Sequence, residues 1–151
     1  NARIAAMNYA MEHDDGQSLR DLAKAELILI APSRCGKTPT SLYMALQYGV
    51  FATNYPLIAE DLEAGRLPDV LKQNPTKLFG LTSDPERLSQ VRSERRPGSQ
   101  YASLAQCAFE LRQAEAMYRK HQIPFLNSAN MSIEEMTTLI MQEKALRKTL
   151  F

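Results

Sequence analysis

The amino-acid sequence predicts an α/β domain, with a mostly parallel sheet of about four strands and helices on both faces. Short apolar stretches alternate with segments of helical periodicity, which implies βαβ units. Two of these stretches, at 27–38 and 77–88, run directly from an apolar strand through a turn into a helix. The length of 151 residues and 44% hydrophobic residues suit one domain over residues 1–151.

The N-terminal part predicts helices and then a buried strand. Ile4, Met7 and Met11 fall at helical spacing, and the stretch "HDDG" (13–16) ends that segment with a glycine. Residues 18–24 predict one further short helix, and the compact apolar run "ELILIA" (26–31) predicts the first strand.

The next segment predicts a helix, a strand and another helix. Residues 38–48 have the pattern of a helix, in which Pro39 is tolerated because it falls in the first turn. The stretch "GVFATNYP" (49–56) predicts a short strand, and residues 57–74 contain a helix, "IAEDLEAG", before a proline-marked connection.

Residues 77–88 predict a third strand followed by a helix. Asp84 is its expected N-cap, Pro85 stands at its first position, and "RRPGS" ends it. A long helix is expected from Tyr101, with an inward face made of Leu104, Cys107, Ala108, Leu111, Ala114 and Tyr118.

The C-terminal part predicts the fourth strand at "IPFLNS" (123–128) and a last helix. Ser132 and Glu135 have the spacing of a capping box at the start of that helix. Ile133, Met136 and Ile140 are expected to face inward.

Composition excludes several functions. The net charge of +1 does not favour broad binding to nucleic acid or to a membrane surface, and no apolar run approaches membrane-spanning length. Cys35 and Cys107 have no metal-ligand or redox spacing, which favours a reduced cytoplasmic protein. The chain starts with Asn-Ala-Arg and not with Met, so we expect it to be part of a longer protein.

The stretch "APSRCGKT" (31–38) is one residue away from a phosphate-binding loop, because Ala31 replaces the first glycine. In such P-loop-type domains backbone N–H groups and a helix N-terminus bind a phosphate. Gly36 would allow close approach, Lys37 would supply charge, and Thr38 would ligate Mg²⁺. The predicted nucleotide-binding residues are Ala31, Pro32, Ser33, Arg34, Cys35, Gly36, Lys37 and Thr38. Neighbouring N–H groups would also lower the pKa of Cys35. We interpret this cysteine as incidental to the loop and not as a redox sensor.

Several blocks of the sequence, in order, resemble one family. They are "HDDG", "SRCGKTPTSLYMALQYGV", "NYPL", "LFGLTSDPERLSQVRSERRPGSQYASL", "IPFLN" and "SIEE". The chain resembles the phosphoenolpyruvate synthetase regulatory proteins, a bifunctional kinase/phosphorylase family that also regulates pyruvate, phosphate dikinase. It departs from the family at Ala31-Pro32, where glycine is usual. It is similar to the C-terminal, nucleotide-binding part of such proteins.

The resemblance implies that ADP phosphorylates a threonine on phosphoenolpyruvate synthetase, and that inorganic phosphate reverses this and releases pyrophosphate. The implied cofactor is Mg²⁺, and the implied protein partner is the synthetase. Whether the protein forms a homodimer is left open. Two other hypotheses remain: a P-loop small-molecule kinase, and a non-catalytic ADP-sensing domain.

Other polar residues carry two interpretations each. Arg92, Arg95 and Arg96 have helical spacing and either clamp a phosphate or the target phosphothreonine, or form a solvated face. Asp84 either assists Mg²⁺ or the target hydroxyl, or only caps a helix. The candidates for the base that takes the threonine proton are Asp14 and Asp15, which otherwise form an acidic turn.

Overall fold

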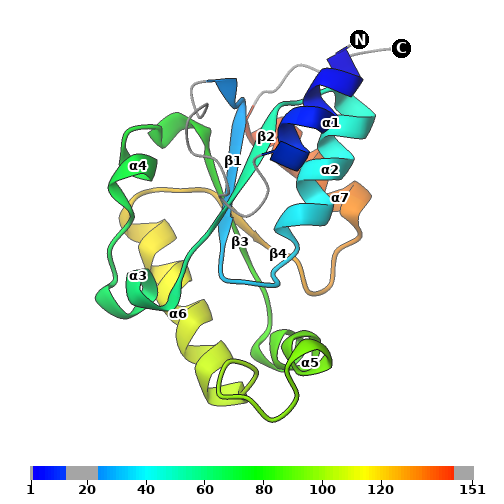
Figure 1. Ribbon diagram of the computed structural model, residues 1–151. Helices are drawn as coiled ribbons and strands as arrows, with labels where there is room; N and C mark the ends of the chain where they lie inside the picture. Colours follow the sequence, from blue (N-terminus) through cyan, green and yellow to red (C-terminus); the bar gives the residue numbers. More distant parts are fainter. Residues whose placement is uncertain (1, 13–23, 145–151) are drawn as a thin grey trace.

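The computed structural model describes residues 2–12 and 24–144, and only the backbone of residues 2 and 9–12. Strands and helices alternate along the chain (Figure 1). In order, they are α1 (Ala2–Glu12), β1 (Leu27–Ala31), α2 (Lys37–Tyr48), β2 (Ala52–Pro56), α3 (Ala59–Ala64), α4 (Asp69–Lys72), the 3₁₀ turn η3 (Pro75–Lys77), β3 (Leu78–Thr82), α5 (Pro85–Arg95), α6 (Leu104–Lys120), β4 (Phe125–Asn127) and α7 (Ile133–Glu143).

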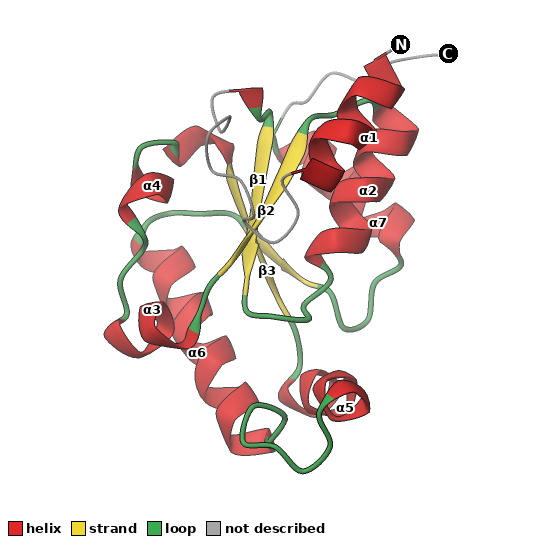
Figure 2. Ribbon diagram, viewed as in Figure 1, coloured by secondary structure: helices red, strands yellow, loops and turns green. Residues whose placement is uncertain are grey.

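The four strands form one sheet in the order β2-β1-β3-β4, and every neighbouring pair is parallel. The predicted α/β class with four parallel strands is therefore confirmed. Figure 2 shows the strands passing through the centre, with α1, α2 and α7 on one side and α3, α4 and α6 on the other. Helices on both faces are also as predicted.

Alternate residues of β1 point to opposite faces and so define two apolar cores. Leu27 and Leu29 pack with side chains of α2 and α7, whereas Ile28 and Ile30 pack with side chains of α3, α4 and α6. All five residues of β1 are buried because helices cover both faces.

The strand order reverses direction at β1. β2 lies on one side of β1, whereas β3 and β4 lie on the other. The helix that follows β1, α2, and the long helix between β3 and β4, α6, lie on opposite faces of the sheet (Figure 1). Because such a switch point opens a crevice at the carboxyl ends of the strands, ligand binding is expected beyond Ala31 and Thr82.

Several predicted boundaries were correct and others were wrong. The capping box at Ser132 and Glu135 opens α7 as expected. The long helix starts at Leu104 and not at Tyr101, because the Ser103 side chain accepts a hydrogen bond from the Gln106 N–H and caps it. Leu104 is 50% exposed and does not face inward, since it stands in the first turn. The helix predicted at 18–24 lies outside the described residues, except for its last residue.

Among the residues that the structure describes, no helix combines the length and the apolar character needed to cross a membrane.

Candidate functional site

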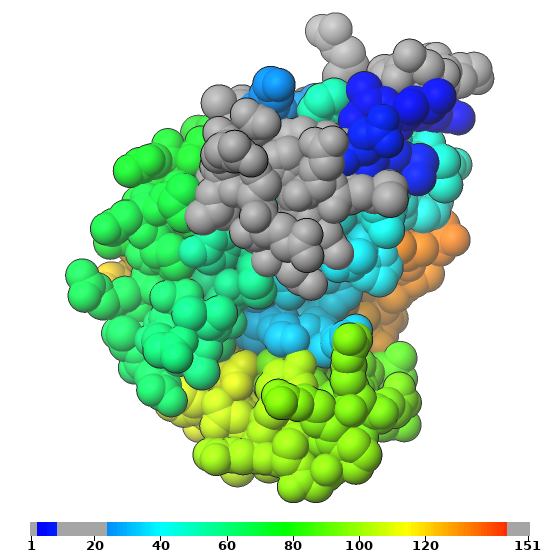
Figure 3. Space-filling view, in the orientation of Figure 1, coloured from blue at the N-terminus to red at the C-terminus, as the bar shows by residue number. Residues whose placement is uncertain are grey.

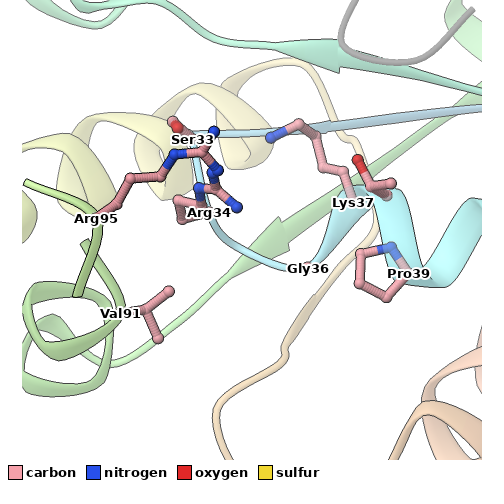
Figure 4. Close-up of a pocket in the computed structure, with 8 residues that line it drawn as sticks. Ser33, Arg34, Gly36, Lys37, Pro39, Val91 and Arg95 are labelled. Carbon is pink, nitrogen blue, oxygen red and sulfur yellow. The ribbon is translucent and has the colours of Figure 1, made fainter. Parts of the chain in front are cut away.

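The segment between β1 and α2 lies at the carboxyl edge of the sheet, beside the crevice. A cavity of about 580 Å³ opens there, lined by Ser33, Arg34, Gly36, Lys37, Thr38, Pro39, Val91 and Arg95. In Figure 4, Lys37 projects from the start of α2, whereas Arg95 reaches from α5 toward Ser33 and Arg34. We call residues 32–36 the loop.

Two residues of the loop have left-handed backbone conformation. Gly36, the residue before α2, has a φ of 91°, which glycine adopts without strain. Arg34 has a φ of 72°, which is uncommon for a residue with a Cβ. A conformation of this kind persists only where the surroundings impose it, and it is typical of functional sites.

Donors elsewhere in the protein hold the carbonyl groups of the loop. The Lys37 Nζ donates to the Pro32 oxygen at 3.2 Å. The Arg92 guanidinium donates to the Ser33 oxygen at 3.1 and 3.2 Å, and the Ser128 hydroxyl donates to the Cys35 oxygen at 3.0 Å.

The next carbonyl, that of Gly36, accepts from the Thr40 hydroxyl at 2.7 Å. By contrast, the backbone N–H groups of Arg34 and Gly36 donate to none of the described residues. With four of its five carbonyl groups engaged, the loop has N–H groups left over at the positive end of α2, which is the arrangement that binds an anion.

Lys37 and Thr38 stand side by side in the first turn of α2. Lys37 is 4% exposed, although it lines the cavity. The Thr38 hydroxyl accepts a long hydrogen bond of 3.5 Å from the Asn54 side-chain amide on β2. Both predicted residues are therefore placed together at the loop.

The three predicted arginines do not share one role. Arg92 is fully buried and pairs with Glu110 at 2.8 Å, so it does not belong to an exposed clamp. Arg95 and Arg96 are exposed and line a further cavity of about 540 Å³ with Ser33, Arg34 and Tyr101. Of the predicted trio, only these two are open to a ligand.

Arg96 also departs from the expected spacing, because α5 ends at Arg95. Its guanidinium lies 5.7 Å from the centre of the Tyr101 ring, a cation–π distance.

Asp84 has the expected N-cap position at α5, but its side chain accepts no capping hydrogen bond. It accepts instead from the Asn127 side-chain amide at 3.0 Å. This contact joins the carboxyl ends of β3 and β4 and leaves Asp84 partly exposed beside the crevice. Asp14 and Asp15 lie outside the described residues.

The prediction for the Cys35 thiol was wrong. Burial raises its pKa to about 11, and the opposing charges of Lys37 and Arg92 do not compensate. The thiol is 2% exposed and belongs to the apolar core under the loop.

Cys35 is accordingly expected to resist alkylation in the folded protein. With a pKa of about 11, only about one thiol in a thousand is ionised at pH 8, and access is blocked as well. Peptide mapping after iodoacetamide treatment at pH 8 measures this, with the denatured protein as the reference. The unfolded thiol ionises at lower pH, so stability should fall as the pH rises from about 9 through 11. Fast labelling of the native protein would contradict the buried position.

The substitution Ala31→Gly is expected to change ADP affinity by less than about tenfold, or 1.4 kcal/mol. Ala31 ends β1 and is not among the positive-φ residues, so it does not need glycine's freedom. A glycine in this buried strand position costs roughly 0.5–1 kcal/mol of stability. Calorimetry with ADP measures the change, and a much larger gain in affinity would mean that Ala31 impairs the loop.

Sequence reasoning did not find two contributors to the site. Ser128 follows β4 directly and holds both the Cys35 and the Thr82 carbonyls. Its position after a strand end was a usable signal. The Tyr101 hydroxyl lies 2.6 Å from that of Ser33. No signal in the sequence pointed to Tyr101, because its place depends on how α5 and α6 pack.

The fold and the loop define a class of protein: a parallel α/β domain whose first strand leads through a tight, glycine-containing loop into a helix, at the switch point of the sheet. Within that class, the model of the kinase/pyrophosphorylase family matches residues 1–141, and the chain belongs to this family.

The chain is similar to curated proteins named phosphoenolpyruvate synthase regulatory protein. Those of Salmonella paratyphi B (strain ATCC BAA-1250 / SPB7), Salmonella newport (strain SL254) and Salmonella enteritidis PT4 (strain P125109) are each 55% identical over 151 residues. The match covers 100% of this chain and 54% of each relative, so the chain spans about half the length of these relatives.

Proposed function

We propose that this chain is the nucleotide-binding part of a regulator of phosphoenolpyruvate synthase in the cytoplasm. The regulator uses ADP to phosphorylate a threonine of the synthase, and inorganic phosphate to remove that phosphoryl group. The observation that carries the proposal is the loop, in which donors hold four carbonyl groups while N–H groups of Arg34 and Gly36 stay available.

In the forward reaction the diphosphate of ADP binds in the cavity between the loop and Lys37. The threonine hydroxyl attacks the β-phosphorus, the bond from that phosphorus to the bridging oxygen breaks, and AMP leaves. The lysine charge and the N–H groups stabilise the charge on the transferring group. The proton of the threonine passes to a carboxylate, for which Asp84, Asp14 and Asp15 are the candidates.

In the reverse reaction an oxygen of inorganic phosphate attacks the phosphorus of phosphothreonine. The threonine oxygen leaves and takes up a proton, and the product is pyrophosphate. Pyrophosphate has the shape and charge of the diphosphate of ADP, so one loop serves both directions. Arg95 and Arg96 are exposed and line a cavity with Ser33 and Arg34, and in this proposal they bind the phosphate on the target.

The residues present fit a bound Mg²⁺. Among the described residues there is no group of three or more His, Cys, Asp or Glu side chains that holds a metal. Mg²⁺ in phosphoryl-transfer sites is bound mainly by phosphates and water with one or two protein oxygens, and Thr38 offers a hydroxyl at the cavity. When bound, the ion would neutralise charge on the diphosphate.

The test uses the longer protein that contains this chain, purified synthase and ADP labelled in its β-phosphate. Label on a threonine of the synthase supports the proposal. A small-molecule kinase would instead prefer ATP and act without the synthase. A nucleotide sensor would bind ADP and leave the synthase unlabelled, and either result would overturn the proposal.

A further inference from the structure

The guanidinium of Arg92 has an acceptor for each of its five N–H groups. Nη2 donates to Glu110 at 2.8 Å and to the Ser33 carbonyl at 3.1 Å, and Nε donates to the same carbonyl at 3.2 Å. Nη1 donates to the Tyr101 carbonyl at 3.0 Å and, weakly, to the Cys107 sulfur at 3.9 Å. No donor of this side chain is left for a ligand.

The charge of Arg92 is balanced inside the protein. Both Arg92 and Glu110 are buried, and the second carboxylate oxygen of Glu110 accepts from the Gln106 side chain at 2.8 Å. Burial acts to lower the pKa of Arg92, but the hydrogen bond and charge of Glu110 outweigh it, so this pKa lies above its ordinary value. A buried ion pair is a poor source of stability, because apolar side chains of equal volume serve as well or better. Since stability does not account for the buried pair of Arg92 and Glu110, the directions in which Arg92 donates its hydrogen bonds need another explanation.

That geometry joins two segments at the site. One contact of Arg92 is the Ser33 carbonyl in the loop, and another is the Tyr101 carbonyl in the segment between α5 and α6. The Tyr101 ring lies 4.2 Å from the guanidinium carbon, and its hydroxyl is hydrogen-bonded to that of Ser33. Figure 3 shows this segment, in yellow-green, lying next to the blue and cyan atoms at the start of α2.

We propose that Arg92, held by Glu110, is a positioning residue for the phosphate loop. The two-pronged contact fixes the plane of the peptide group between Ser33 and Arg34, because a fork of two N–H groups constrains direction as well as distance. This keeps the Ser33 carbonyl directed at α5, and it places the Arg34 N–H and the left-handed turn at Arg34 where an incoming diphosphate needs them. The identity of the ligand as a diphosphate group rests on the proposed function, whereas the positioning of the loop by Arg92 does not depend on it.

The substitution Arg92→Lys tests this, because lysine keeps the charge and loses the fork. The matched control is Arg119→Lys on α6, where Arg119 is largely exposed and pairs with Glu115 at 3.5 Å and not with a residue of the loop. Two rates are measured by peptide mapping without any ligand: alkylation of Cys35 in the loop, and alkylation of Cys107, which is buried on α6. Calorimetry then measures the affinity for pyrophosphate.

In Arg92→Lys we expect Cys35 to react at least about tenfold faster while Cys107 stays protected, and pyrophosphate to bind at least about tenfold more weakly. The control should change neither. Faster reaction of both thiols means that Arg92→Lys unfolds the protein. In that case Glu110→Gln, which keeps a neutral acceptor, is the deciding variant, and it should raise the alkylation rate of Cys35 alone.

An unchanged Cys35 rate in a folded variant, with pyrophosphate affinity unchanged, overturns the positioning role. If Cys35 is released but the unsubstituted chain binds neither pyrophosphate nor ADP, the proposed function fails and the positioning of the loop by Arg92 stands.

Discussion

Lys37→Ala is expected to abolish threonine phosphorylation and phosphorolysis together, each by about a thousandfold or more. Lys37 is the cationic side chain of the first turn of α2, and it lines the cavity at the loop. If the diphosphate of ADP and the forming pyrophosphate occupy the same place, both reactions need the same charge on the transferring group. The rates are measured in the longer protein with the synthase, and pyrophosphate should compete with ADP.

The Lys37 side chain is also part of the fold, since it donates to the Pro32 carbonyl. Lys37→Met keeps most of the buried volume and removes the ammonium group, with both its charge and its hydrogen bond to the Pro32 carbonyl, so it should be as inactive as Lys37→Ala. Lys72→Ala, on α4, removes a lysine from a surface pair with Asp69 and should leave both rates unchanged. If phosphorolysis survives in Lys37→Met while phosphorylation is lost, the two reactions use separate sites and the shared loop is wrong.

The alternation of strands and helices could be read from the sequence because each buried strand carries its own apolar pattern. β1 is the clearest case, since helices on both faces require an apolar residue at each of its positions. β4 is only three residues long, and the neighbouring strand β3 determines its extent. Strand ends were predicted less well for this reason.

The arginine trio shows where periodicity fails. Arg92 follows Leu88 by one helical turn, and Leu88 is buried, so the inward direction of Arg92 was legible in the sequence. Its partner Glu110 lies 18 positions further on, which no local pattern reveals. Arg96 lies beyond the end of α5, so the helical spacing that would place it on one face with Arg92 does not apply to it.

The shape of the loop depends on contacts between distant parts of the chain. The Gly-Lys-Thr end could be recognised because glycine, lysine and threonine each have a chemical task there. The left-handed turn at Arg34 could not, since nothing in an arginine favours it. The donors that accompany this turn come from Arg92 in α5 and from Ser128 after β4.

Gly80→Ala is expected to lower the free energy of unfolding by about 3 kcal/mol, the upper end of the cost of overpacking. A Cβ built at Gly80 would lie 2.6 Å from Cζ of Tyr118 and 2.7 Å from its Cε2. The ring is fully buried and packs at 5.2 Å against the Phe125 ring, so it has little room to retreat. For a chain of this length the melting temperature should fall by roughly 10 °C, measured by calorimetry.

This clash also reaches the functional edge of the sheet. The Tyr118 hydroxyl lies 3.0 Å from the Ile30 carbonyl and 2.9 Å from the Leu81 carbonyl, one residue before the ends of β1 and β3. A displaced ring would leave these buried carbonyls without that donor, which adds to the cost. Gly98→Ala is the control, because nothing lies within 4 Å of its Cβ and only its positive φ of 69° is strained. It should cost roughly 1–2 kcal/mol.

A double-mutant cycle isolates the ring as the cause. In a Tyr118→Ala background the space above Gly80 is empty, so adding the Cβ of Gly80→Ala should cost little or even fill part of the cavity. The two substitutions are therefore expected to be strongly non-additive, with the double variant about as stable as Tyr118→Ala alone. If Gly80→Ala instead destabilises both backgrounds equally, its cost comes from the strand backbone and not from Tyr118.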